Sequence, residues 1–322
     1  MSPLALVRRF PLLAFMLFAC LFGWSFYILD FLTGASGSSN LPVGPFFAVI
    51  LVLSCQGRAE LRAWGRRIRN WRASPQWYLL VVLAPLAMVV LIVVVNHGFG
   101  APLPTSSQLA GWPQVPASFL VMLVLVGIGE EAGWTAFVAP ILLRRHGILV
   151  ASVLAAAMRI FWHLPMMFTG ELSWTIGVLG NAAFTLLSLL ILLASDGQWA
   201  LVAVWHATLN AASGLFVFTM VSGVDKARLG LLLSLSYSAV AVLAYIAGRR
   251  HVTARPDSTV SRTAMSATSS RARTGSTPHR LRRALVPHPE LNQGIHPSLD
   301  LVADRSDPLD VLACGSSSSQ SS

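Results

Sequence analysis

Residues 117–143 read ASFLVMLVLVGIGEEAGWTAFVAPILL. As a helix, this run is long enough to cross a hydrocarbon core of roughly 30 Å, and its charged residues are Glu130 and Glu131 alone. A charge at the bilayer centre costs at least about 2.5–3.5 kcal/mol, so such residues usually mark a functional site. A structural carboxylate paired with a cation on another helix is the alternative. This run alone leaves both explanations open.

The whole chain has the composition of a membrane protein. Of its 322 residues, 55% are hydrophobic and 11% are charged, whereas soluble domains carry about 25% charged residues. Strict alternation of apolar and polar residues, typical of membrane strands, does not appear. We therefore predict an all-α fold, a polytopic transmembrane helical bundle of about eight spans. The expected spans are 10–32, 42–57, 77–97, 117–143, 148–168, 174–194, 198–221 and 229–247.

The basic residues predict an orientation. With eight spans, four arginine-bearing segments fall on one side of the membrane, while the loops on the other side carry Lys226 and Arg228. Arginine-rich loops are typically cytoplasmic, so we expect a multi-pass protein of the plasma membrane with both termini in the cytoplasm. This bias accounts for the net charge of +10 and requires no nucleic-acid partner. The arginines in question are Arg8, Arg9, Arg58, Arg62, Arg66, Arg67, Arg69, Arg72, Arg144, Arg145, Arg249 and Arg250.

Two regions differ from the apolar spans. Residues 1–251 are predicted to form the transmembrane domain, and residues 252–322, rich in Ser, Thr, Pro and Arg, a disordered cytoplasmic tail. Within the domain, the arginines of residues 58–72 recur at helical spacing. That segment is either an interfacial helix on anionic lipid or a solvated loop.

Two further expected spans carry polar residues at helical spacing. Arg159 and His163 are four residues apart, as are His206 and Asn210, so each pair shares one face of its helix. A single His or Asn in a membrane helix more often links helices by hydrogen bonds. His163 lies late in its span and His206 early in its own, which predicts a depth difference of roughly 10 Å.

A carboxylate, imidazoles and an amide that face one bundle interior suit the hydrolysis of a bond by water. Hydrolysis needs a base that takes a proton from water and hydrogen-bond donors for the developing oxyanion. Adjacent residues on a helix point about 100° apart, so only one of Glu130 and Glu131 is expected to aim at the site.

Three motifs in this order resemble a known family. EEAGW (130–134), WHLP (162–165) and H-x-x-x-N (206–210) are similar to those of the CPBP intramembrane proteases, the CaaX-protease and bacteriocin-processing (Abi) family. The resemblance covers about 117–221. It implies an intramembrane endopeptidase in which Glu130 activates water beside His163, His206 and Asn210 hold the oxyanion, and Glu131 supports them.

The resemblance also bears on cofactor and substrate. The family is described either as metalloproteases or as glutamate proteases, so zinc is possible, with Glu130, His163 and His206 as its ligands. We expect no obligatory metal, because no close His-x-x-x-His pair occurs. The expected partner is a membrane-associated peptide or protein in the bilayer, such as a prenylated CaaX-type C-terminus or a leader peptide.

Two positions depart from the family pattern. Thr135 stands where the family has Arg, and Arg159 where it has Phe. Our hypothesis is that Arg159 neutralises Glu131 in place of the missing arginine. The alternative is a non-catalytic immunity or partner-binding protein on the same scaffold, and a transporter with a polar midplane site is a third possibility.

Overall fold

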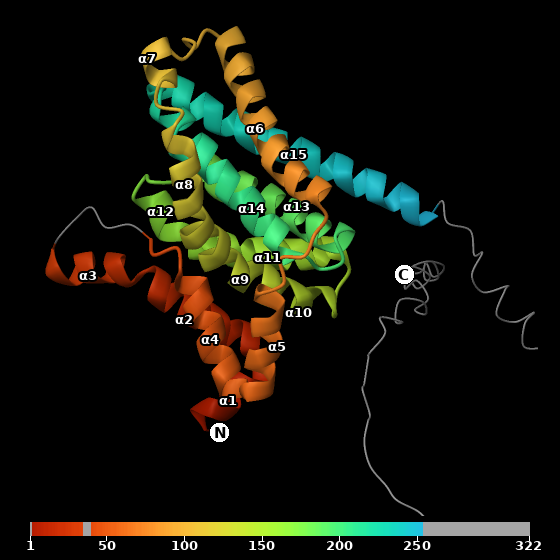
Figure 1. The fold of residues 1–322 in the computed structure, drawn as a ribbon. Coiled ribbons are helices and arrows are strands. Elements are labelled where there is room, and N and C mark those ends of the chain that lie inside the picture. The colour runs from red at the N-terminus through yellow and green to blue at the C-terminus, as the bar shows by residue number, and fades with distance from the viewer. Residues whose placement is uncertain (1, 35–39, 254–322) are drawn as a thin grey trace, which may run out of the picture. The chain divides into compact units, whose positions relative to one another are not determined.

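Helices make up the described fold (Figure 1). This computed structural model describes residues 2–34 and 40–253, with side chains up to Gly248, and contains no strand within these ranges. The predicted all-α fold is therefore confirmed. The predicted tail, 252–322, lies outside the described residues except for its first two positions, and it stays a prediction.

Among the described residues, five helical segments are long and apolar enough to cross a membrane, so the chain is a multi-pass membrane protein. Each coincides with an expected span, and the second of them carries the two glutamates. The segments are α6 (Pro75–Gly98), Gln114–Leu143, Thr175–Ala194, Trp199–Thr219 and Gly223–Gly248 of helix α15, which runs over Gly223–Thr253.

The other three expected spans are shorter or broken, so the predicted count of eight is not confirmed. Helices α4 (Gly44–Gln56) and α11 (Ile148–Trp162) have 13 and 15 residues, about 20 Å at 1.5 Å per residue. The expected first span, 10–32, is divided into α2 (Pro11–Gly23) and α3 (Ser25–Thr33). Helix α1 (Pro3–Arg9) precedes it and is bent by 110° from α2. Helix α2 has a proline at its first position, which suits a helix start because proline has no N–H. The count is five, or six if the bent pair crosses once.

Glycines bring the helices of the site's neighbourhood close together. A Cβ on Gly44 would lie 2.7 Å from the backbone nitrogen of Gly23, so α2 and α4 touch backbone to backbone. A Cβ on Gly133 would lie 3.0 Å from the carbonyl oxygen of Pro45. The helix with the two glutamates therefore packs directly on α4.

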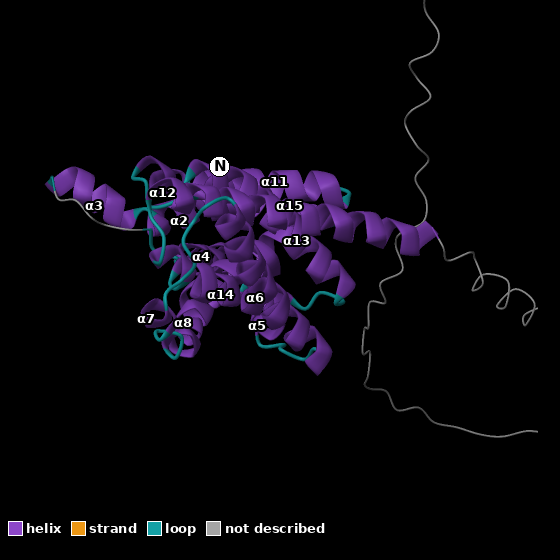
Figure 2. Ribbon diagram, turned by 90° about the horizontal axis from the view of Figure 1, so that it is seen from above, coloured by secondary structure: helices purple, strands orange, loops and turns teal. Residues whose placement is uncertain are grey.

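The remaining helices pack on one another beyond this contact. Helix α14 packs against α6 and η1, and α13 packs against α11 and α15, while α3 extends away from its neighbours in both views (Figures 1 and 2). Their bounds are α5 Arg58–Ile68, α7 Ser106–Leu109, α8 Gln114–Met122, η1 Leu123–Ile128, α9 Gly129–Gly133, η2 Trp134–Val138, α10 Ala139–Leu143, α12 Leu164–Phe168, η3 Thr175–Gly180, α13 Asn181–Ala194, α14 Trp199–Leu209, η4 Asn210–Gly214 and η5 Val217–Thr219.

Candidate active site

The two glutamates lie on α9, between two π-helical turns, η1 and η2. A π-helical turn bonds each N–H to the carbonyl five residues back, and such turns are frequent at functional sites. Helix α5 supplies donors to carbonyls of this segment: Trp64 Nε1 donates to the oxygen of Ala132 at 3.1 Å, and Arg67 Nη1 to that of Ala136 at 2.7 Å. The arginine-rich segment 58–72 thus contains a helix, α5, that packs against the helix carrying the two glutamates. Neither alternative considered from the sequence, an interfacial helix or a solvated loop, included this packing.

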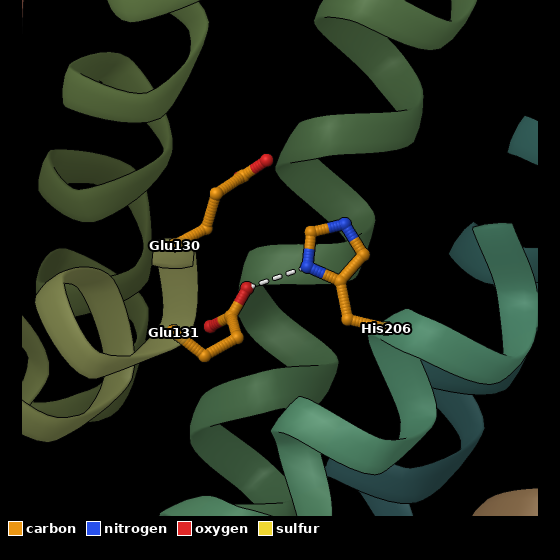
Figure 3. A group of neighbouring side chains, drawn as sticks. All are labelled: Glu130, Glu131 and His206. Atoms are coloured by element: carbon orange, nitrogen blue, oxygen red, sulfur yellow. Dashed lines mark hydrogen bonds and ion pairs between the residues drawn. The ribbon is translucent and has the colours of Figure 1, made fainter. Parts of the chain in front are cut away.

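Glu131 is fully buried and saturated with partners. Arg159 Nη1 lies 2.9 Å from its Oε1 and Arg159 Nη2 donates to its Oε2 at 3.0 Å, a bidentate ion pair. Thr135 Oγ1 also donates to Oε2, and His206 Nδ1 lies 2.8 Å from Oε1 (Figure 3). The contact expected between Arg159 and Glu131 is present. Thr135, which stands at the family's arginine position, donates to the same carboxylate.

Arg159 is 2% exposed, and two aromatic rings flank its guanidinium. The carbon at its centre lies 5.5 Å from the ring centroid of Trp134 and 4.9 Å from that of Phe184, within the range of cation–π attraction. The arginine is therefore held by two carboxylate oxygens and two rings.

Glu130 has a different environment from its neighbour. It points away from Glu131 (Figure 3), and its Oε2 has no hydrogen-bond partner among the described residues. Its nearest cation is Arg159, whose Nη1 lies 3.9 Å from that oxygen. A buried carboxylate oxygen without a protein donor is free to bind a water molecule.

Each of the two histidines uses its Nδ1 for a hydrogen bond within the protein, which leaves its Nε2 for other partners. His163 Nδ1 lies 2.8 Å from the carbonyl oxygen of Arg159. Because a carbonyl oxygen only accepts hydrogen bonds, Nδ1 carries the proton. The neutral ring then keeps an acceptor at Nε2. His206 Nδ1 faces the carboxylate of Glu131, so it too is protonated, and its Nε2 is free. Asn210 uses one amide N–H on the carbonyl of His206, at 3.0 Å, and has a second available.

One cavity of about 370 Å³ joins these groups. Glu130, His163, His206 and Asn210 all line it, whereas Glu131 and Arg159 lie behind its wall. His163 and His206 therefore meet at one cavity despite the depth difference that their positions along the spans predicted.

The cavity contains a polar residue that the sequence did not reveal. Asn40 lines it and is 7% exposed, and within the described part of the chain neither its Oδ1 nor its Nδ2 has a hydrogen-bond partner. Asn40 precedes α4 in a stretch that reads as an ordinary loop, so no sequence signal pointed to it. Asn181 also lines the cavity and donates to the oxygen of Gly177 at 2.9 Å.

The residues do not fit a zinc site in this arrangement. Glu130, Glu131 and His206 offer ligand atoms within 4.8 Å of one another. Both oxygens of Glu131 already face the guanidinium of Arg159, and a metal ion there would lie beside that cation. The triad expected from the sequence, with His163 as the third ligand, does not gather as closely among the described residues.

Comparison with known proteins adds an independent observation. Residues 112–212 match the family model Rce1-like, described as type II CAAX prenyl endopeptidase Rce1-like. This match covers about a third of the chain and supports its resemblance to the CPBP/CaaX proteases. The family indicates a protease, and the matched segment contains the six residues singled out from the sequence. None of the curated proteins matches the chain.

Proposed function

We propose that the protein is an intramembrane endopeptidase whose general base is Glu130. The observation that carries this proposal is the contrast between two neighbouring carboxylates. Glu131 is saturated by Arg159, Thr135 and His206. Glu130 lines the cavity, and its Oε2 has no hydrogen-bond partner among the described residues and lies 3.9 Å from Arg159. Of the two carboxylates, Glu130 is therefore the one available to take a proton from water.

The cavity groups suit each step of peptide hydrolysis. A water molecule bound to Glu130 and oriented by His163 Nε2 gives a proton to Glu130, and its oxygen attacks the scissile carbonyl carbon. The second amide N–H of Asn210 donates to the oxyanion. His206 donates from Nε2 as an imidazolium, which the carboxylate of Glu131 stabilises. The C–N bond then breaks as Glu130 passes its proton to the leaving nitrogen.

Glu131 and Arg159 act on this mechanism through His206. Because Arg159 neutralises Glu131, the carboxylate stays buried without leaving an unpaired charge. Its Oε1 fixes the ring of His206 through Nδ1, which directs Nε2 away from Glu131. In this proposal they are positioning residues, and the reaction needs no obligatory metal.

The test is cleavage of internally quenched peptides, prenylated and unprenylated, by purified protein in nanodiscs. Glu130→Gln should lower kcat by about 10²–10⁴, the usual contribution of a general base. Glu60→Gln, at an exposed glutamate of α5, serves as the control and should cleave as the wild type does. Cleavage that survives Glu130→Gln would move the assignment to a partner-binding protein.

Cleavage measured with and without a chelator tests separately whether the activity depends on a metal ion. Activity unchanged after prolonged chelation supports the metal-independent mechanism. Activity that disappears and returns when zinc is added would contradict it.

A further inference from the structure

Several arginines from separate segments lie at one end of the helices. Arg8 Nε donates to the carbonyl of Cys55, at the end of α4, at 2.8 Å. Trp199, the first residue of α14, donates from Nε1 to the carbonyl of Arg67 at 3.0 Å. The charge of Arg144 is close enough to Arg67 that it adds to burial in lowering the pKa of that guanidinium. Segments far apart in the sequence thus share one end, here called the basic end.

Other contacts define the opposite end. Tyr27 donates to Glu171 at 2.6 Å, which joins α3 to the loop after α12. Asn96, near the end of α6, donates to the carbonyl of Asp225 near the start of α15 at 3.1 Å. The basic residues of this far end are Lys226 and Arg228, and Arg228 is paired with Asp225.

The candidate active-site cavity opens at the far end. The lining residues that are exposed are Glu171, Gly214 and Lys226, from the loop after α12, the end of η4 and the start of α15. None of the lining residues belongs to the connections at the basic end, 57–74, 144–147 and 195–198. Glu130, His163 and Phe184 also line the cavity, and they are buried.

Membrane proteins retain Lys- and Arg-rich short loops in the cytoplasm. We propose that the cavity opens on the non-cytoplasmic face, and that its substrate is a membrane-anchored polypeptide segment presented from that face. The cleavage step rests on the proposed function, whereas the side of access rests on charge and cavity geometry alone. A C-terminus confined to the cytoplasmic face could not reach Glu130 through this mouth.

Cysteine labelling tests the side of access without using activity. In a background with Cys20, Cys55 and Cys314 replaced by alanine, Lys226→Cys marks the mouth and Arg145→Cys the basic end. Both native residues are exposed. A membrane-impermeant maleimide applied to intact cells should label Lys226→Cys, and should label Arg145→Cys only after permeabilisation. Any other pattern overturns the proposal.

Sealed vesicles of known orientation then test the substrate's side of entry. An impermeant quenched peptide should be cleaved by right-side-out vesicles, and by inside-out vesicles only after detergent opens them. Cleavage by sealed inside-out vesicles overturns the inference. Absence of cleavage in both preparations even after detergent refutes the proposed protease, while the labelling result still decides on which face the mouth lies.

Discussion

Removal of Arg159 should expose the energetic role of the buried ion pair. In Arg159→Met, the carboxylate of Glu131 loses both guanidinium contacts, and the contacts of that cation with Trp134 and Phe184 disappear. Removing one partner of a buried pair typically costs about 3–5 kcal/mol, because the other charge stays buried. We expect a loss of that size in the free energy of unfolding, together with loss of peptide cleavage.

Restoring the family pattern should recover much of this loss. Thr135 already donates to Glu131 from one turn along the same helix. An arginine there has the reach to pair with that carboxylate, and phenylalanine at 159 would fill the space between the two rings. The double variant Thr135→Arg, Arg159→Phe should therefore be clearly more stable than Arg159→Phe alone.

The assay is unfolding in mixed detergent micelles, followed by tryptophan fluorescence, with cleavage measured on the same preparations. Arg145→Met is the control, because its side chain is exposed and such changes usually stay within about 0.5 kcal/mol. Arg159→Met with wild-type stability would refute the ion-pair argument. A double variant no more stable than Arg159→Phe would refute the idea that the arginine has moved between helices.

Three further predictions concern the two carboxylates, two buried asparagines and a glycine at a helix contact. Glu130→Gln should lower kcat by about 10²–10⁴ while largely keeping thermal stability. Glu131→Gln should lower both activity and stability, because Arg159 makes its two short contacts with Glu131 and lies 3.9 Å from Glu130. Asn40→Leu should keep or raise the melting temperature, since it removes a buried amide that no described residue bonds. Asn96→Leu should lower the melting temperature, because that amide is bonded to Asp225 and Arg228; equal losses in both asparagine variants would contradict this. Gly44→Ala should destabilise the protein in thermal unfolding, because its Cβ would lie 2.7 Å from a backbone nitrogen of α2.

Several features were predictable from the sequence because they depend on local composition and helical period. Long apolar runs specify membrane helices, since a lipid environment forces backbone groups to pair within the segment. The spacing of the polar residues placed His206 with Asn210 on one helix face. The missing and added arginines at 135 and 159 pointed to a contact across helices, and the structure contains it.

Other features depend on which helices meet, and no local pattern encodes that. Helical period indicated that Glu130 and Glu131 diverge, but only the packing of α11 and α14 around α9 gave partners to Glu131 and left an oxygen of Glu130 free. The same packing made a cavity wall of Asn40, from a stretch that read as a loop. Sequence thus determined an all-helical membrane protein with polar groups within its spans. Burial and pairing between distant segments decided which carboxylate faces the cavity and at which end that cavity opens, because these properties arise only where separate helices come into contact.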